Sequence, residues 1–157
     1  MSDIIKKKCT GCSVIDGDIV PIGGIIYETE NFILIQDAEI CLKGFLIIQA
    51  KKHFSKLLDF DKKVSLELMN LIYEARKALK DLNICDEVTF VQEERSEHFH
   101  IWIHPYYEWM KEKFGKGIQH LRDINDYVME NNSENDKQEV LKTCEQLKNI
   151  LTHKIIK

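Results

Sequence analysis

The chain lacks the features that mark membrane, secreted and nucleic-acid-binding proteins. No apolar run approaches the ~20 residues of a membrane-spanning helix, and residues 1–8 hold too short an apolar stretch for a signal peptide. Asp and Glu outnumber Lys and Arg by 26 to 22, which argues against a broad basic face. These absences predict a cytoplasmic protein with no membrane contact and no extended nucleic-acid binding.

Proline is also scarce, with only Pro21 and Pro105, and the sequence has no repeat and no low-complexity tract. The 157 residues fit one domain. A domain of this size buries about 68–70% of the surface of its unfolded chain, so it needs no disulfides to fold. The odd cysteine count, five, argues against a disulfide framework and for metal binding or incidental use.

Apolar patterning predicts five strands and one main helix before Pro105. Turn-like residues 9–18 come first. Leu68, Leu71 and Ala75 belong to a helical stripe, and Asp61 can cap its start. The strands are expected over 24–28, 32–36, 44–50, 87–92 and 98–104, and the helix over 61–82.

Residues beyond Pro105 change character. A short helix is indicated by Ile118 to Val128, and Ser133 with Asp136 forms a capping-box pattern before a last helix with an apolar stripe at Val140, Cys144, Leu147 and Leu151. The expected fold class is α+β, with an antiparallel five-stranded sheet, a main helix and a C-terminal helical extension. We expect a domain over 1–110 and helices over 111–157 packed on it, with a partner chain as the other possible packing surface.

The strand over 98–104 carries three histidines. Because side chains alternate along a strand, His98, His100, Trp102 and His104 share one face, and the apolar side chains between them form the core face. Imidazoles spaced along one sheet face can share a metal or contact one extended anion. The alternative is a chance cluster of surface histidines.

Cys9 and Cys12 form a C-x2-C knuckle around Gly11. Zinc takes four tetrahedral nitrogen and sulfur ligands, and no second C-x2-C exists, so the two missing ligands are expected to be His53 and His98. A redox pair is the competing interpretation, but it lacks a following helix in the predicted structure. The third interpretation is that Cys9 and Cys12 are two unligated surface cysteines.

Taken together, these residues resemble the histidine triad (HIT) superfamily, specifically its zinc-bearing branch that includes dinucleoside polyphosphate hydrolases. The matching elements are the C-x2-C, the strand that ends in Asp37, the Gly-led strand that runs into Lys51-Lys52-His53, and the run from His98 to Pro105. The match covers roughly residues 9–105 of 157.

The resemblance implies roles for single residues. His100, the middle histidine, is the expected nucleophile; its attack on an α-phosphorus would form a nucleotidyl-histidine that water resolves. Asp37 matches the position that binds ribose hydroxyls. Cys9, Cys12, His53 and His98 match the ligands of a structural zinc. The resemblance also implies a homodimer.

The sequence departs from the family pattern near the phosphate. Trp102 stands at the third histidine of the motif, and indole cannot give up a proton as imidazolium does. His104 could replace it only with a shifted substrate. In the preceding segment, which holds three acids and no glycine, Gln92 and Ser96 are the candidate phosphate donors. The expected substrate-binding residues are Asp37, Gln92, Ser96, Trp102 and His104.

Three functions stay open. The first is a nucleotide hydrolase that cleaves at the α-phosphate of a dinucleoside polyphosphate or a nucleoside phosphoramidate. The second is a nucleotide-binding module with weak or no catalysis because of Trp102. The third is a metal-binding module in which the histidine strand itself chelates a transition metal.

Overall fold

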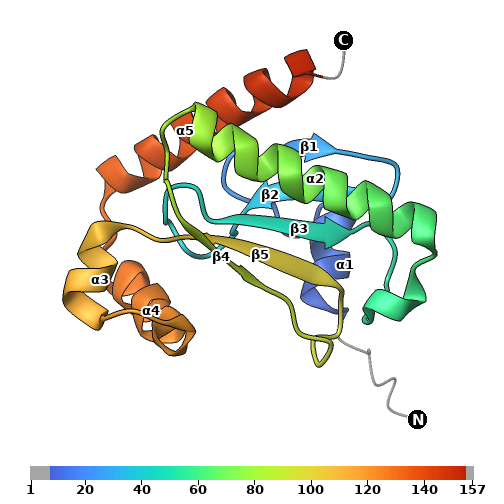
Figure 1. Ribbon diagram of the computed structural model, residues 1–157, viewed down its shortest axis with the longest axis horizontal. Coiled ribbons are helices and arrows are strands. Elements are labelled where there is room, and N and C mark those ends of the chain that lie inside the picture. Colours follow the sequence, from blue (N-terminus) through green and yellow to red (C-terminus); the bar gives the residue numbers. More distant parts are fainter. Residues whose placement is uncertain (1–7, 155–157) are drawn as a thin grey trace.

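The computed structural model describes residues 8–154. Its centre is a five-stranded sheet in the order β1-β2-β3-β5-β4, with every neighbouring pair antiparallel (Figure 1). The strands follow the predicted ranges within two residues at each end: β1 Ile25–Glu28, β2 Phe32–Gln36, β3 Leu46–Ala50, β4 Val88–Val91 and β5 His100–Pro105. The expected α+β class, with an antiparallel sheet of five strands, is therefore confirmed.

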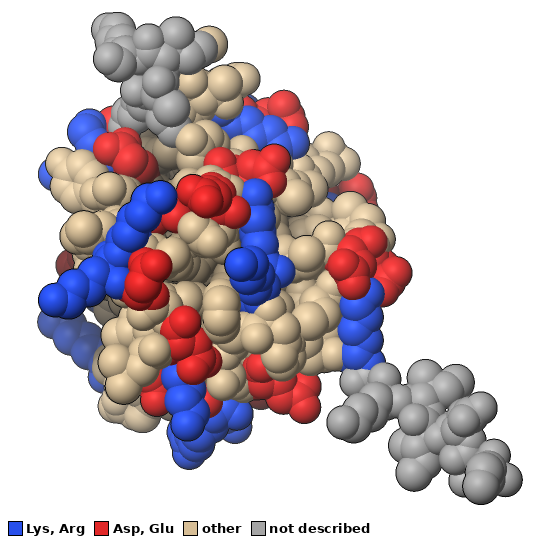
Figure 2. Space-filling model, turned by 90° about the vertical axis from the view of Figure 1, so that its right-hand side faces the viewer, with Lys and Arg blue, Asp and Glu red and all other residues tan. Residues whose placement is uncertain are grey.

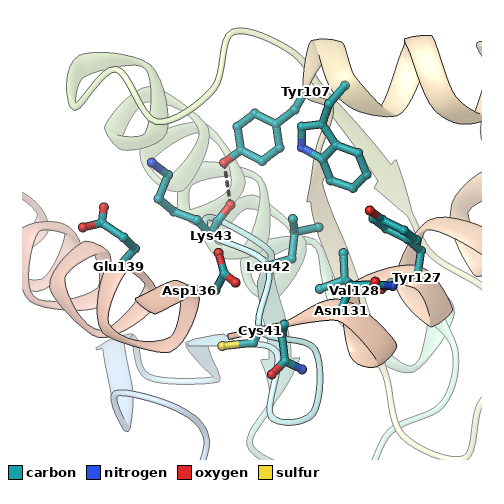
Figure 3. A pocket seen from close by; sticks show the side chains of 11 residues that line it. Cys41, Leu42, Lys43, Tyr107, Tyr127, Val128, Asn131, Asp136 and Glu139 are labelled. Carbon is teal, nitrogen blue, oxygen red and sulfur yellow. Dashed lines mark hydrogen bonds between the residues drawn. The ribbon is translucent and has the colours of Figure 1, made fainter. Parts of the chain in front are cut away.

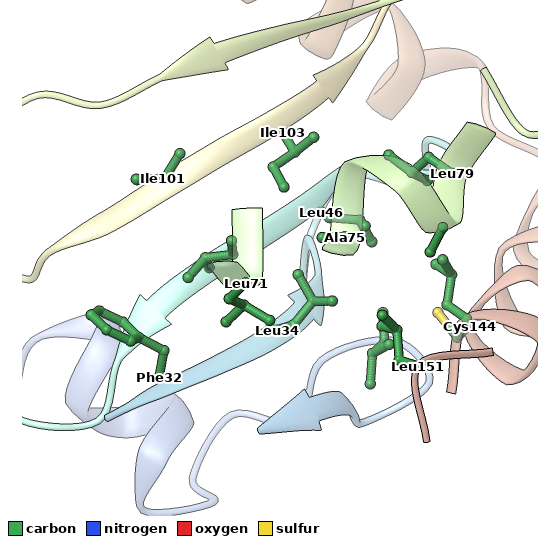
Figure 4. Close-up of a cluster of buried hydrophobic side chains, with 14 of the residues drawn as sticks. Phe32, Leu34, Leu46, Leu71, Ala75, Leu79, Ile101, Ile103, Cys144 and Leu151 are labelled. Atoms are coloured by element: carbon green, nitrogen blue, oxygen red, sulfur yellow. The ribbon is translucent and has the colours of Figure 1, made fainter. Parts of the chain in front are cut away.

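One face of the sheet is covered by α2 (Lys62–Asp81) and α5 (Glu134–Lys154) (Figure 1). Asp61 caps α2 by accepting a hydrogen bond from the Val64 N–H at 2.8 Å, as predicted. The apolar stripe of α2 packs on side chains from β2, β3 and β5, and α5 closes the core beside it (Figure 4). The labelled members of this core are Phe32, Leu34, Leu46, Leu71, Ala75, Leu79, Ile101, Ile103, Cys144 and Leu151.

The apolar stripe of α5 belongs to this core. Val140, Cys144 and Leu147 are fully buried in the same cluster as α2, which leaves no part of that stripe for a partner chain. Ser133 and Asp136 form the predicted capping box at the start of α5: the Asp136 carboxylate accepts from the Ser133 N–H at 2.8 Å, and the Asp136 N–H donates to the Ser133 hydroxyl at 3.2 Å.

The opposite face of the sheet is covered at its two ends. At one end, Val14 of α1 (Thr10–Ile15) packs on Ile33 and Ile35 of β2. At the other end, α3 (Glu108–Phe114) and α4 (Leu121–Asn131) pack over Phe45. Short 3-10 turns, Leu57–Asp59 and Ile118–His120, precede α2 and α4. The middle of this face carries the polar side of β5.

Two helices differ from the sequence prediction. Residues 10–15 form α1 rather than a turn, because the Cys9 sulfur accepts the Cys12 N–H and caps a helix of only six residues. The seven residues of α3 were not predicted, because they are too few to show helical periodicity. No helix among residues 8–154 is both long enough and apolar enough to cross a bilayer.

Candidate functional site

Four cysteine and histidine side chains converge at the α1 end of the sheet. Cys9 and Cys12 come from α1 and its cap, His53 follows β3, and His98 precedes β5; their ligand atoms all lie within 4.8 Å of one another. The two cysteine sulfurs lie 3.4 and 3.2 Å from Nδ1 of His53, and 3.5 and 3.6 Å from Nδ1 of His98. Tetrahedral zinc with ordinary bond lengths sets neighbouring sulfur and nitrogen ligands about 3.5 Å apart, so the cluster fits a metal ion.

The His98 ring is oriented for this role by the backbone. Its Nε2 lies 2.7 Å from the Ala50 carbonyl oxygen. Nε2 therefore donates its hydrogen there, and Nδ1 keeps its lone pair facing the two sulfurs. Burial lowers the pKa of His98, which favours the neutral imidazole that a metal ion needs.

Gly11 makes room for the same ring. A Cβ at this position would lie 2.3 Å from Cγ of His98, a distance that atoms cannot share. The Gly11 carbonyl also accepts a hydrogen bond from the Gln49 amide at 2.8 Å, which ties α1 to β3. Gly11 therefore allows the close approach of His98 to a helix, rather than a turn within residues 9–18.

His100 lies beside this cluster with one ring nitrogen engaged. Nδ1 lies 2.9 Å from the His98 carbonyl oxygen and donates to it, so the neutral ring carries its lone pair on Nε2. His100 is half-buried and lines a cavity of about 450 Å³. Gln49 is directly opposite it on β3 and lines the same cavity.

Asp37 lies at another wall of this cavity, just after β2. Its Oδ1 accepts hydrogen bonds from the backbone N–H groups of Glu39 at 2.9 Å and Ile40 at 2.7 Å. Burial raises the pKa of the Asp37 carboxyl, and these two bonds oppose the shift. Among residues 8–154, Oδ2 receives no hydrogen bond, so it remains available to a ligand hydroxyl. Apolar side chains complete the wall: Val14, Ile19, Ile35 and Ile47.

The other predicted substrate contacts are divided between the cavity and other parts of the protein. Ser96 and Trp102 line the cavity. Gln92 is exposed just past β4 and is not in its lining. The Ser96 hydroxyl lies 3.2 Å from the Glu93 carbonyl and 3.1 Å from the His98 carbonyl. Its single proton is therefore already engaged.

His104 lies outside the cavity, contrary to the predicted substrate contact. It is fully buried, with Nδ1 2.9 Å from the Pro105 carbonyl and Nε2 2.8 Å from the side-chain amide of Asn125 in α4. The Phe45 ring packs on it at a centroid distance of 4.6 Å. Burial lowers the pKa of His104. Because both ring nitrogens have partners, none remains for a substrate.

The three histidines of residues 98–104 also do not form a metal site of their own. His98 turns its Nδ1 to the cysteines, His100 engages its Nδ1 with backbone, and His104 is buried. Among the described residues, the cysteine–histidine cluster at α1 is the only group with metal-ligand geometry. The structure therefore does not support chelation by the histidine strand.

The charge around the cavity is negative. Asp37, Glu39 and Glu97 line it, and no Lys or Arg of residues 8–154 does. On the face shown in Figure 2, acidic and basic side chains are interspersed and form no continuous basic patch. Neither feature suits an extended nucleic acid.

A second cavity, of about 410 Å³, lies at the opposite end of the molecule (Figure 3). The segment 41–43 forms one wall, and α3, α4 and the start of α5 form the others. The Tyr107 hydroxyl donates to the Lys43 carbonyl at 2.6 Å and fixes that wall. None of the motif residues from His98 to Trp102 lines this cavity.

Two residues that shape the site were not among the predicted site residues. Gln49 is a polar residue on the site face of β3, and its position among apolar neighbours was the available signal. Asn125 had no local signal, because its contact with His104 joins residues 21 positions apart.

Comparison with known proteins gives a consistent result, although no family model matches the chain. An uncharacterised HIT-like protein of Methanocaldococcus jannaschii is 30% identical over 118 residues, which are 69% of this chain and 88% of the relative.

Solved structures share the fold. A hypothetical histidine triad nucleotide-binding protein of Sulfolobus tokodaii superposes with a TM-score of 0.63 at 21% identity, covering 90% of this chain and 93% of its own. A zinc-bound histidine triad protein of Mycobacterium smegmatis gives a TM-score of 0.60 at 19% identity, covering 90% and 96%. The sequence relative, the shared fold and the arrangement of His98 and His100 agree: the chain belongs to the histidine triad (HIT) family.

Proposed function

We propose that the protein is a nucleotide hydrolase that cleaves at an α-phosphate through a nucleotidyl-histidine intermediate on His100. The observation that carries this proposal is the engaged Nδ1 of His100, bonded to the His98 carbonyl at 2.9 Å. The bond leaves the Nε2 lone pair as the nucleophile in a cavity that also holds Asp37. Dinucleoside polyphosphates and nucleoside phosphoramidates are the candidate substrates.

A nucleotide would bind in this cavity in one orientation, from Asp37 towards Trp102. Oδ2 of Asp37 would accept a hydrogen bond from a ribose hydroxyl, and the apolar wall beside it would contact the base. The α-phosphate would then lie at His100, and the leaving group would point along β5 to Trp102. The second N–H of the Gln49 side-chain amide, beside the one donated to Gly11, would donate to a phosphate oxygen.

We propose a structural zinc ion for Cys9, Cys12, His53 and His98. When bound, it would fix α1 against β3 and β5, and so hold the His98 carbonyl that orients His100. The zinc-bound relative from Mycobacterium smegmatis supports the choice of metal.

The test is a panel of both substrate classes with wild type and His100→Asn. We expect wild-type turnover, a mass gain of one nucleotidyl group after an alkaline quench, and a loss of turnover on the order of 10³ or more in the variant. Equal rates in both proteins with no adduct would refute the proposal.

A nucleotide-binding module with little catalysis is the second candidate, and Trp102 is the observation that favours it. Calorimetry separates the two candidates: binding of a nucleoside monophosphate without turnover of any panel member selects the module. A protein that neither binds nor cleaves nucleotides would contradict both.

We further propose a homodimer formed through β4. Among the described residues, β4 pairs on one side only, and its Phe90 is 48% exposed. Phe90→Lys should convert a dimer to a monomer in analytical ultracentrifugation, and Met129→Lys, at an exposed apolar position of α4, is the matched control. A monomeric wild type or an unaffected Phe90→Lys dimer would refute this interface. The homodimer and the cytoplasmic location stay predictions.

A further inference from the structure

The leaving-group end of the cavity is built from an indole. Trp102 is directly opposite Ile47 on β3 and Val91 on β4. Its ring packs edge-on against Phe45 at a centroid distance of 5.3 Å, and lies 6.4 Å from the His100 ring. An indole N–H can donate a hydrogen bond, but it does not release its proton. Trp102 therefore cannot act as a general acid.

His104, the next imidazole on this face of β5, cannot take over the role. It is fully buried with the Phe45 ring packed on it, and its two ring nitrogens are held by Pro105 and Asn125. Two residues along a strand also displace a side chain by about 6–7 Å. Bringing this ring to the leaving group would require α4 to detach.

The rest of the lining offers no imidazole with a free proton at that end. Its other acidic residues, Glu39 after β2 and Glu97 before His98, are exposed carboxyl groups away from Trp102 along the chain. The Nε2 hydrogen of His98 is donated to the Ala50 carbonyl, and the Ser96 proton is engaged by backbone carbonyls. Asp37 follows β2, which β3 separates from β5. Two strand spacings put its Cα about 9–10 Å from the line of β5, and in the proposed pose its free carboxylate oxygen is taken up by the ribose hydroxyl.

We propose, on the basis of the hydrolase function above, that this active site selects substrates whose leaving group departs as a stable anion without receiving a proton. In the first step, the His100 Nε2 lone pair forms a bond to the α-phosphorus, and the electron pair of the broken phosphorus–oxygen bond stays on the leaving oxygen. In the second step, water attacks phosphorus, its proton goes to solvent, and the phosphorus–nitrogen electron pair returns to Nε2.

The chemical class of the substrate follows from the requirement that the leaving group departs as an anion. Nucleoside monophosphates joined to a carboxylate or an acidic phenolate meet the requirement, because these groups are stable as anions. Simple alkyl esters and amidates do not, because an alkoxide or amide ion is too basic to depart unprotonated. Of the two candidate classes named above, phosphoramidates are therefore the poor substrates.

A series of aryl esters of adenosine 5′-monophosphate tests this selection, from dinitrophenyl to unsubstituted phenyl, with adenosine 5′-phosphoramidate as the amine case. With wild type, kcat/KM should fall on the order of tenfold for each unit of leaving-group pKa, since charge on the leaving oxygen is not neutralised. A shallow dependence, or phosphoramidate turnover as fast as that of the dinitrophenyl ester, would overturn the proposal.

Trp102→His is the decisive variant. An imidazole at this position should raise the ratio of kcat/KM for the phenyl ester, and for the phosphoramidate, to kcat/KM for the dinitrophenyl ester about 100-fold above the wild-type ratio. Trp102→Phe is the matched control and should not raise kcat/KM for the phenyl ester or the phosphoramidate. If both variants leave the dependence on leaving-group pKa equally steep while their melting temperature and zinc content stay at wild-type values, position 102 does not set the selection and the proposal fails.

Failure of the proposed function gives a different result. In that case the dinitrophenyl ester is also cleaved no faster by wild type than by His100→Asn. The proposal on leaving groups is overturned separately, by wild-type turnover that depends on His100 but not on the acidity of the leaving group.

Discussion

The two ends of β5 carry the same residue type on the same face, with opposite outcomes. At one end, His98, just before the strand, faces the cysteines at α1, and His100, the first residue of the strand, lines the cavity. At the other end, His104 is sealed under α4 and bonded to Asn125. What covers a strand position decides whether its imidazole faces the cysteines, lines the cavity or belongs to the core.

The largest loss of stability is expected when the cysteine–histidine cluster at α1 is disrupted. Cys12→Ser removes one of the four proposed zinc ligands. Structural zinc sites contribute much of the stability of small domains, so we expect the free energy of unfolding to fall on the order of 5 kcal/mol or more, with no bound zinc. Thermal unfolding and metal analysis measure both.

Cys41→Ala is the matched control for Cys12→Ser, because Cys41 is a buried cysteine at the opposite end of the sheet. It should keep one zinc per chain. Zinc retained in Cys12→Ser would contradict the site.

Disrupting the His104 end of β5 should lower the free energy of unfolding and leave the zinc content unchanged. His104→Leu removes both ring hydrogen bonds and leaves the buried Asn125 amide unpaired, so we expect a cost of about 2–3 kcal/mol in urea unfolding with zinc content unchanged. A stability change within error would show that His104 is not held as the structure has it.

Gly11→Ala should weaken the metal site without harming the helix. The new Cβ would displace the His98 ring, which we expect to lower zinc affinity about tenfold, or about 1.4 kcal/mol. Alanine favours a helix over glycine by about 0.5–1 kcal/mol, which offsets only part of the cost of displacing the His98 ring in the metal-free protein. Competition with a zinc chelator measures the affinity, and wild-type affinity in the variant would argue against the close approach.

The smallest effect is a pH dependence that belongs to His104. Burial lowers its pKa below the ordinary 6.5, so the unfolded chain binds this proton at a higher pH than the folded protein does. The free energy that His104 contributes to folding is therefore fully present above pH 6.5. It is lost as the pH falls below that value, by at most about 1.4 kcal/mol per pH unit.

Unfolding of wild type and His104→Leu between about pH 8 and about pH 5.5 isolates this effect. Wild type should lose more stability on acidification than the variant does, and zinc release, common to both proteins, cancels in the difference. Parallel curves for the two proteins would contradict a lowered pKa.

Much of the fold follows from local patterns in the sequence. The alternation from Phe99 to Ile103 and the stripe from Leu68 to Leu79 each fix one buried face, because apolar periodicity shows which side of an element meets the core. The spacing of Cys9 and Cys12 predicted a metal site, and the structure brings these cysteines to His53 and His98 as that prediction requires. By contrast, α1 and α3 are too short for periodicity to indicate.

The sequence by itself determined the strand faces, the main helix and the residue types that can bind metal and attack phosphorus. Only the tertiary structure decided which of these side chains are accessible. Asn125 reaches His104 from 21 residues away, and Gly11 admits the ring of His98. Such contacts depend on how separate elements pack. A local sequence pattern does not show which distant element will cover a given residue.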